Sequence, residues 1–279
     1  MISPKKKLLL LHSSNDLYGA SKIFLQLIDL LTKNGFDVHI IIPEKGMLDD
    51  FLIKKDIKIE YLELGVLRKK YLNPLGLINR LVANVKAIAF LSKYIKDHSI
   101  DLVYTNTSTI LSGGIAAKKN GVPSLFHIHE IPTGNKLYEF FSGKIINRYS
   151  SKVLTVSNSV KKHWLKYIDD KKIERIYNGI IFSKTNSLIK LERDQDDFVI
   201  TSVARLIPYK GHSYLIDIAS ELIKKSTKFK FLIVGDTLSS YVSYEKSVKQ
   251  KVKDLGLENQ IKFLGFRNDI SDILKQSDL

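Results

Sequence analysis

The sequence predicts an α/β protein built from two doubly wound parallel sheets. Short apolar runs with the length of strands alternate with amphipathic segments of helical period along nearly the whole chain. The alternation lapses once, in the polar stretch 183–197, and then resumes. The length of 279 residues leaves room for two domains of moderate size. We therefore expect one domain over 1–182, a linker over 183–197 and a second, partial domain over 198–279.

The elements of the first domain follow from the spacing of its apolar residues. The stretch 20–33 repeats them at intervals of three and four, as in an amphipathic helix, and Asn34-Gly35 ends it. Runs such as 37–42 have the length and β-branched content of buried strands. In chain order, we expect strands at 7–12, 37–42, 57–62, 101–105, 123–128, 152–156 and 172–177, and helices at 20–33, 75–96, 110–119, 136–149 and 159–167.

The second domain repeats the same alternation on a smaller scale. We expect strands at 198–204, 229–234 and 260–264, and helices at 211–226, 244–255 and 269–276. Strands joined through helices pair in parallel, so both sheets should be covered on both faces.

Composition narrows the classes of function. Lysine and arginine total 44 against 29 acidic residues, a net charge of +15 that favours a polyanionic partner: nucleic acid, anionic lipid or a phosphorylated small molecule. No zinc pattern, basic zipper helix or aromatic-basic RNA signature supports nucleic acid. The chain has 0 cysteines, which excludes disulfides and Cys-ligated metals. Apolar runs such as 8–11 are far below the ~20 residues that span a bilayer, and we see no signal peptide, so we expect a cytoplasmic protein.

Two segments of the first domain follow predicted strands, where parallel sheets bind ligands. The stretch 15–20 ends in Gly19-Ala20 at the start of a helix, whose backbone N–H groups could approach an anion or could simply form a tight turn. His127-Ile128-His129-Glu130 ends a strand, and alternation puts the two histidines on one face. A histidine beside a carboxylate could position or deprotonate a hydroxyl, or could be a hydrogen-bonded structural residue.

The second domain offers a stronger candidate. Between its first strand and helix, Arg205 and Lys210 flank Pro208 and bring two cations to a helix N-terminus, where an anion would relieve their repulsion. A phosphate site is the economical interpretation. Gly235 and Gly265 end the next two strands and leave room for a flat ligand, although turn geometry would explain them too.

These motifs together resemble glycosyltransferase family 4, a family of GT-B sugar transferases. The resemblance is carried by VARLIPYKG (203–211), FLIVGD (231–236), FLGFR (263–267) and the final Ser-Asp-Leu. In the first domain Tyr18-Gly19-Ala20 is similar to the family's Gly-Gly-Ala loop, and 156–159 and 177–180 are similar to its stretches before the hinge. The resemblance covers essentially the whole chain and implies two Rossmann-like domains, the first on the acceptor side and the second for the nucleotide-sugar.

The resemblance implies a role for each matching residue. Arg205 and Lys210 match the pair that holds the donor diphosphate, and His129 matches a histidine near the transferring sugar; these three would be catalytic. The implied donor-binding residues are Gly19, Arg205, Lys210, Gly235, Phe266 and Arg267, and the implied acceptor-side residues are Tyr18, Gly19, His127 and Glu130. Family members usually retain the anomeric configuration without a metal, so neither a metal nor a cofactor is expected. Two fixed cations could stabilise the leaving diphosphate, since even one oxyanion donor is worth ~3 kcal/mol.

The chain departs from the family pattern at its end. Family members continue past the Ser/Ala-Asp-Leu segment with another strand, a Glu-Gly-Phe-Gly-like loop and two glutamates, whereas this sequence stops at Leu279. We expect a C-terminally truncated form with little or no turnover, in which the strand 198–204 lies at the edge of its sheet. Tyr18 in place of the loop's first glycine is a milder departure.

The sequence therefore predicts a glycosyltransferase that moves a sugar from a nucleotide-sugar to a lipid-linked or polysaccharide acceptor. Its basic surface would hold it against anionic lipid at the inner face of the membrane. The alternative is a non-catalytic remnant or partner subunit that only binds the nucleotide-sugar. A sugar-nucleotide epimerase on the same fold should show more carboxylates than Glu130.

Overall fold

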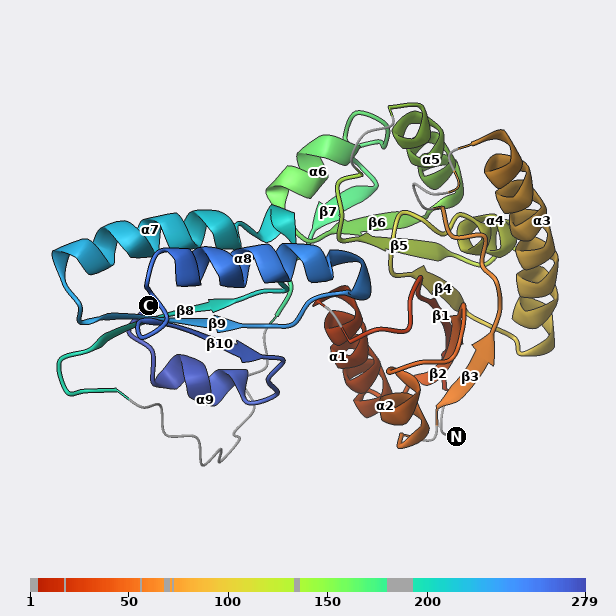
Figure 1. Cartoon of the computed structure of the whole chain (residues 1–279). Helices are drawn as coiled ribbons and strands as arrows, with labels where there is room; N and C mark the ends of the chain where they lie inside the picture. Colours follow the sequence, from red (N-terminus) through yellow and green to blue (C-terminus); the bar gives the residue numbers. More distant parts are fainter. Residues whose placement is uncertain are drawn as a thin grey trace. The chain divides into compact units, whose positions relative to one another are not determined.

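A computed structural model describes residues 5–17, 19–55, 57–67, 71, 73–132, 136–179 and 193–279. The chain divides into two compact units, Met1–Gly179 and Ile180–Leu279, and each has its own sheet (Figure 1). Most of the predicted linker, 183–192, lies outside the described residues. Its last part is held by the second unit, because the Arg193 guanidinium donates hydrogen bonds to the backbone oxygens of Asp197 and Gln276.

The first unit is built on a seven-stranded sheet in the order β3-β2-β1-β4-β5-β6-β7, with every pair parallel. The chain moves outward from β1 to β3, returns to place β4 beside β1, and then moves outward the other way. The topological switch point therefore lies between β1 and β4, at whose carboxyl ends a ligand crevice is expected. The strands are β1 (Lys7–Leu11), β2 (Asp37–Ile42), β3 (Lys58–Tyr61), β4 (Leu102–Thr105), β5 (Ser124–Ile128), β6 (Lys152–Thr155) and β7 (Ile173–Arg175).

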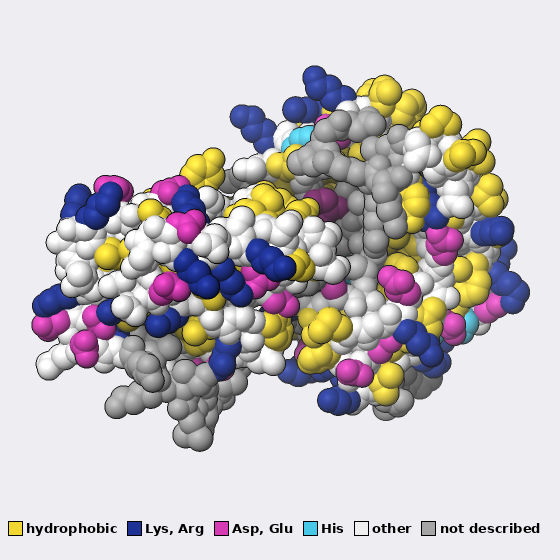
Figure 2. Space-filling model, viewed as in Figure 1, with side chains coloured by type: hydrophobic (Ala, Val, Ile, Leu, Met, Phe, Trp, Pro, Cys, Tyr) yellow, Lys and Arg dark blue, Asp and Glu magenta, His cyan; other side chains and the backbone are white. Residues whose placement is uncertain are grey.

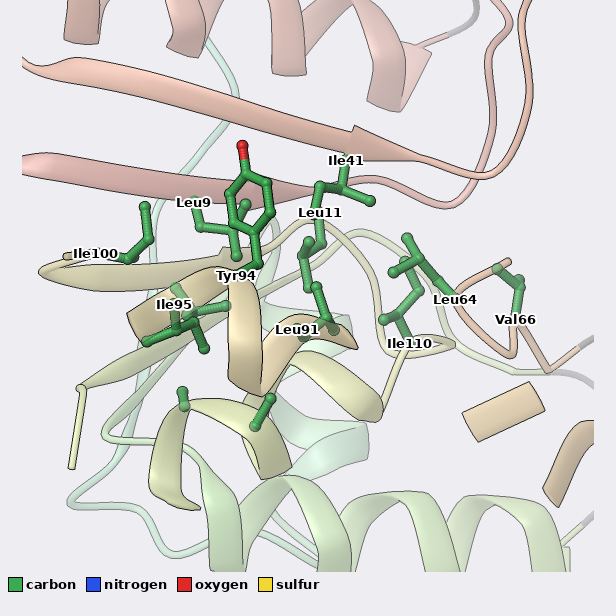
Figure 3. Packing of buried hydrophobic residues seen from close by; sticks show 13 residues of the cluster. Leu9, Leu11, Ile41, Leu64, Val66, Leu91, Tyr94, Ile95, Ile100 and Ile110 are labelled. Carbon is green, nitrogen blue, oxygen red and sulfur yellow. The ribbon is translucent and has the colours of Figure 1, made fainter. Parts of the chain in front are cut away.

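Helices cover both faces of this sheet. Successive leucines of β1 point to opposite faces, so both faces need cover. Leu8 and Leu10 pack with the buried residues of α1 (Gly19–Lys33) and α2 (Asp49–Ile53). Leu9 and Leu11 pack on the opposite face with α3 (Pro74–Asp97) and α4 (Ser112–Lys119) (Figure 3). A third cluster around Trp164 joins β5 and β6 to α5 (Lys136–Tyr149) and α6 (Asn158–Trp164). The sheet is therefore buried on both sides, which is what its apolar strands need.

The second unit carries a three-stranded parallel sheet in the order β10-β9-β8. Its strands are β8 (Phe198–Val203), β9 (Phe229–Val234) and β10 (Ile261–Gly265). Phe231 and Ile233 of β9 face α7 (His212–Lys225) and α8 (Val242–Asp254), while Leu232 and Val234 face α9 (Ile270–Lys275) (Figure 1). β8 is an edge strand of this sheet. The Thr201 N–H donates to the Leu279 carbonyl, and the Asp278 and Leu279 N–H groups donate to Val199, so the last residues of the chain lie along that edge.

The predicted fold class is confirmed, and the predicted strands and long helices all occur with ends that differ by a few residues. Helix α2 is an unpredicted element, because it is only 5 residues long and too short to show a period. The 3-10 turns η2 (Pro208–Lys210) and η3 (Ser239–Tyr241) are unpredicted as well.

The expectation drawn from uninterrupted apolar runs did not take account of α3. This helix has 24 residues, and by length and composition it could cross a bilayer, with a mean hydropathy of 1.3 over 18 residues. The length of uninterrupted apolar runs does not reveal this helix, because polar residues divide it into short runs while its mean hydropathy stays high. These residues are Asn79, Arg80, Asn84 and Lys86. Only 22% of that window is buried within the protein.

Candidate active site

Polar residues follow three neighbouring strands of the first unit at their carboxyl ends. His12 follows β1, Asn106 follows β4, and His129 follows β5. Because β1, β4 and β5 are adjacent in the sheet, the topology brings these side chains together beside the switch point. His12 and Asn106 are each 1% exposed, so this is a buried polar cluster rather than a solvated surface.

Asn106 is the centre of this cluster. Its Oδ1 atom accepts hydrogen bonds from His129 Nε2 at 2.9 Å and from the Tyr104 hydroxyl at 3.0 Å. Its Nδ2 atom donates to His12 Nδ1 at 3.1 Å and to the Ala20 carbonyl at 3.4 Å. All four positions of the amide are therefore used.

The two predicted histidines of β5 lie side by side, as their spacing in the strand required. The rings of His127 and His129 are 4.3 Å apart between centroids. His127 Nδ1 lies 2.6 Å from the Tyr104 hydroxyl, which in turn bonds Asn106. Both histidines thus contact the same central amide, one directly and one through a tyrosine.

Glu130 accepts hydrogen bonds from the loop that follows β4. Its Oε1 atom accepts from the Thr107 hydroxyl at 2.8 Å, from the Ser108 N–H at 2.8 Å and from the Ser108 hydroxyl at 2.7 Å. Its Oε2 atom accepts from the His129 N–H at 3.1 Å. Behind it, the buried Trp164 indole donates to the Glu130 carbonyl at 3.2 Å. The carboxylate therefore fixes the backbone on which His129 is mounted.

Burial keeps the histidines of this edge neutral. It lowers the pKa of His12 to about 4, against a smaller opposing effect of Asp16. It lowers the pKa of His127 to about 3, and neighbouring His129 acts in the same direction. The pKa of His129 is lowered by burial as well, although the Glu130 carboxylate raises it in part. At neutral pH each ring has one donor nitrogen and one acceptor nitrogen.

The glycine loop at the start of α1 is adjacent to this cluster. A Cβ built on Gly19 would meet nothing within 4 Å, and its backbone has no left-handed conformation that demands glycine. The described residues thus give no internal reason for glycine here, which leaves space in front of the helix N-terminus. Tyr18, the predicted acceptor-side neighbour, lies outside the described residues.

In the second unit, the segment between β8 and α7 has a fixed backbone. The Leu206 N–H donates to the Asp236 carbonyl at 2.8 Å, and Pro208–Lys210 form a 3-10 turn. Gly211 follows with φ 75°, the left-handed conformation that favours glycine, and the 14-residue helix α7 starts at His212. Lys210 is exposed and forms no ion pair with the part of the chain that the structure describes. The turn therefore presents this lysine at the N-terminus of α7.

The other predicted donor residues lie at the carboxyl ends of β9 and β10. Gly235 has φ 144°, and a Cβ there would collide with the Ala204 carbonyl oxygen, so an internal contact explains this glycine. Its N–H donates to the Gly265 carbonyl at 2.8 Å. The side chain of Phe266 is 46% exposed. Arg267 forms a bidentate ion pair with Asp269, with Nε and Nη2 donating at 2.8 and 2.7 Å.

The histidines of β5 and the basic turn were predicted from the sequence, whereas Asn106, Tyr104 and His12 were not. For Asn106 and His12 the available signal is position, since each directly follows an apolar strand. Within the described residues, no three His, Asp or Glu side chains group as a metal site would require.

Two doubly wound units, one with buried histidines at a switch point and one with a basic turn before a helix, define a GT-B sugar transferase. The chain belongs to glycosyltransferase family 4, since residues 18–184 match that family. Residues 183–279 match the family described as glycosyl transferases group 1. The chain is thus a glycosyltransferase.

Named relatives agree with this class. The chain is 29% identical over 288 aligned positions to the Escherichia coli UDP-Gal:alpha-D-GlcNAc-diphosphoundecaprenol alpha-1,3-galactosyltransferase, covering 94% of this chain and 69% of that protein. Among solved structures, Anabaena HepE in complex with UDP and glucose is 25% identical with a TM-score of 0.77, covering 98% of this chain and 73% of that one. A Rickettsia africae glycosyltransferase shares the fold at 23% identity and a TM-score of 0.77, covering 98% and 72%.

Proposed function

We propose that the protein transfers a hexose from a UDP-sugar to a lipid-linked glycan at the inner face of the membrane. The observation that carries the donor half of the proposal is the basic turn Arg205–Gly211 ahead of α7. A backbone-fixed turn presents an exposed lysine at a helix N-terminus, where a diphosphate is stabilised by charge and by N–H groups. The relatives named with UDP and with UDP-galactose support a uridine nucleotide.

In the reaction, the bond between the sugar C1 and the diphosphate oxygen breaks, and C1 bonds to an acceptor hydroxyl, whose proton passes to the departing diphosphate and from there to water. The nucleoside diphosphate leaves with the negative charge of the broken bond. Arg205 and Lys210 are the cations that would stabilise this charge. The proposal includes that transfer retains the anomeric configuration and needs no metal ion. His129, held at the end of β5, would contact the transferring sugar.

The acceptor side of the proposal follows from the first unit. Gly19 leaves open space at the N-terminus of α1, next to the cluster that holds His127 and His129. Glu130 is bonded to the 107–108 loop, so we assign it the positioning of His129 rather than direct contact with the acceptor. The lipid-linked diphosphate substrate printed in the name of the Escherichia coli relative supports an acceptor of that class.

The surface of α3 supports the place at the membrane in this proposal. Seven apolar side chains of this helix are at least 40% exposed: Leu75, Leu77, Ile78, Leu81, Val82, Val85 and Phe90. Figure 2 shows hydrophobic side chains along the side of the first unit where Figure 1 places α3. A face of this kind on a soluble surface indicates a binding surface. We name these seven residues the α3 face.

The occupant that fits the α3 face is an anionic bilayer. Asp97 is the sole acidic residue of the helix, while Lys86, Lys93 and Lys96 are basic, so charge favours anionic headgroups. The opposite side of α3 packs Leu91, Tyr94 and Ile95 against β1 in the core. Crossing the bilayer would remove those contacts, whereas lying in the interface keeps them.

The donor site is tested by calorimetry on the purified chain with UDP, UDP-glucose, UDP-galactose and the corresponding guanosine nucleotides. We expect uridine nucleotides to bind, and Arg205→Ala to weaken them roughly 10- to 100-fold, as loss of a charged hydrogen bond predicts. The control is Lys228→Ala, which removes one positive charge from the same unit at the amino end of β9 and should leave affinity unchanged.

Full affinity in Arg205→Ala would contradict the donor site. The alternative of a non-catalytic nucleotide-sugar-binding subunit predicts the same binding but no release of UDP when a lipid-linked acceptor is added. Measured UDP release above that of Arg205→Ala would exclude it.

A further inference from the structure

A continuous series of hydrogen bonds joins His129 to Asp16 across the switch point. His129 Nε2 bonds Asn106, Asn106 bonds His12, and His12 Nε2 bonds the Ser21 hydroxyl at 2.9 Å. The Ser21 hydroxyl then donates to Asp16 Oδ1 at 2.8 Å. The members come from the ends of β1, β4 and β5, from α1 and from the loop between β1 and α1, so the folded sheet creates this series.

The orientation of the Asn106 amide is fixed at one end by the backbone. The Ala20 carbonyl oxygen can only accept a hydrogen bond, so the atom of Asn106 that faces it at 3.4 Å is the nitrogen. Oδ1 is therefore the atom that faces His129 Nε2 and the Tyr104 hydroxyl. His129 has to donate from Nε2, which leaves the lone pair on Nδ1.

The carboxylate at the other end fixes the same orientation independently. Asp16 Oδ1 only accepts, so Ser21 donates its single hydrogen there and must itself accept from His12 Nε2. His12 Nδ1 is then an acceptor and needs a donor, which the Asn106 nitrogen supplies. Both ends thus demand one arrangement, in which every donor points from His129 toward Asp16.

We propose that Asn106 is a positioning residue that holds His129 in the Nε2–H tautomer, with Nδ1 kept as the acceptor for a hydroxyl of the sugar substrates. The inference rests on the proposed function for the identity of that hydroxyl. The tautomer itself follows from the hydrogen bonds alone. A neutral histidine free in water exchanges between its two tautomers, so a fixed lone pair is a property that the fold confers.

The experiment is long-range proton–nitrogen NMR on the chain labelled with [¹⁵N]histidine, which shows which ring nitrogen carries hydrogen. His129→Gln and His12→Gln identify their signals. We expect His129 protonated on Nε2 at pH 7 in the wild type, and a mixture of tautomers in Asn106→Ala. Asn84→Ala, which removes another half-buried amide of the same unit, is the control and should leave His129 unchanged.

A second variant separates Asn106 from the rest of the series. Ser21→Ala removes the link to Asp16 but keeps the amide that the Ala20 carbonyl orients, so His129 should keep its tautomer, and His12, whose Nδ1 still accepts from the Asn106 nitrogen, should keep its own. His129 protonated on Nδ1 in the wild type, or a tautomer that Asn106→Ala leaves unchanged, overturns the proposal. If Asn106→Ala does not fold, the wild-type and Ser21→Ala spectra still decide.

The link to function has its own readout on the same samples. Calorimetry with UDP and UDP-glucose measures how much the sugar adds to affinity, and this increment should fall about tenfold in both Asn106→Ala and His129→Gln, with UDP affinity retained. A fixed tautomer with an unchanged sugar increment would overturn the role toward substrate. Failure of the chain to bind any nucleotide would instead contradict the proposed function and leave the tautomer result standing.

Discussion

The histidines at the carboxyl ends of the first sheet's strands are buried and hydrogen-bonded. Their protonation therefore changes the free energy of unfolding. His12 is 1% exposed, and its pKa in the folded chain is about 4, against 6.5 for an ordinary histidine. Between these two pH values the unfolded chain binds a proton that the folded chain does not. Stability contributed by the neutral ring is therefore present above pH 6.5 and lost as pH falls toward 4.

We predict that the first unit loses about 3 kcal/mol of unfolding free energy from His12 across that window. The chain has 1 tryptophan, the buried Trp164, so its fluorescence reports the unfolding of this unit. Urea unfolding followed by Trp164 at pH 7, 5.5 and 4.5 measures the loss. His12→Gln removes the titrating ring, and its stability should fall less steeply; equal slopes in the two proteins would contradict the assignment.

For single residues, the sequence predicted the contacts that arise within one strand. It did not predict the contacts that depend on the order of the strands in the sheet. His127 and His129 share a face because residues two apart in a strand always do. Asn106 and His12 are 94 positions apart in sequence and meet only because β4 returns to pair with β1. Position 235 is similar, since its need for glycine comes from the carbonyl of Ala204, which directly follows the neighbouring strand β8.

Among the elements, helix α3 leaves one apolar side uncovered by the rest of the protein. Its core side is fixed by packing with β1 and α4, and its opposite side carries the seven residues of the α3 face. Local sequence predicted the helix but not this asymmetry, because which apolar residues are buried depends on how many neighbours the fold supplies. Strand and helix positions were predictable throughout, since both faces of the sheets are apolar and the periods are clear.

We predict that Ile78→Glu combined with Leu81→Glu lowers binding to vesicles containing phosphatidylglycerol at least tenfold. These side chains are 60% and 66% exposed, so their burial in lipid is worth on the order of 2 kcal/mol each and their replacement adds repulsion. Co-sedimentation with the vesicles measures the change. Ile218→Glu, at a 56% exposed position of α7 in the other unit, is the matched control.

Two further outcomes of that experiment matter. Equal binding by the double variant and the wild type would contradict the α3 face as the lipid-binding surface. Equal binding of the wild type to neutral and anionic vesicles would contradict the charge argument based on Lys86, Lys93 and Lys96.

At the scale of the whole molecule, two separate cores should give two separable stabilities. The clusters around Leu9 and Phe24 lie in the first unit, and those around Phe231 and Ile273 lie in the second. The sequence indicated two domains because its alternation lapses and restarts. It could not indicate which residues would report on each core, since that depends on packing.

We predict that Gly235→Ala destabilises the second unit by about 2–3 kcal/mol, because its Cβ would meet the Ala204 carbonyl in a conformation that side chains rarely adopt. Far-UV circular dichroism should show part of the urea transition at lower concentration, while the Trp164 fluorescence midpoint stays in place. Gly265→Ala is the control, since φ is 65° there but nothing lies within 4 Å, so we expect a loss of about 1 kcal/mol. A Trp164 midpoint that moves together with the circular dichroism would show instead that the two units unfold as one cooperative body.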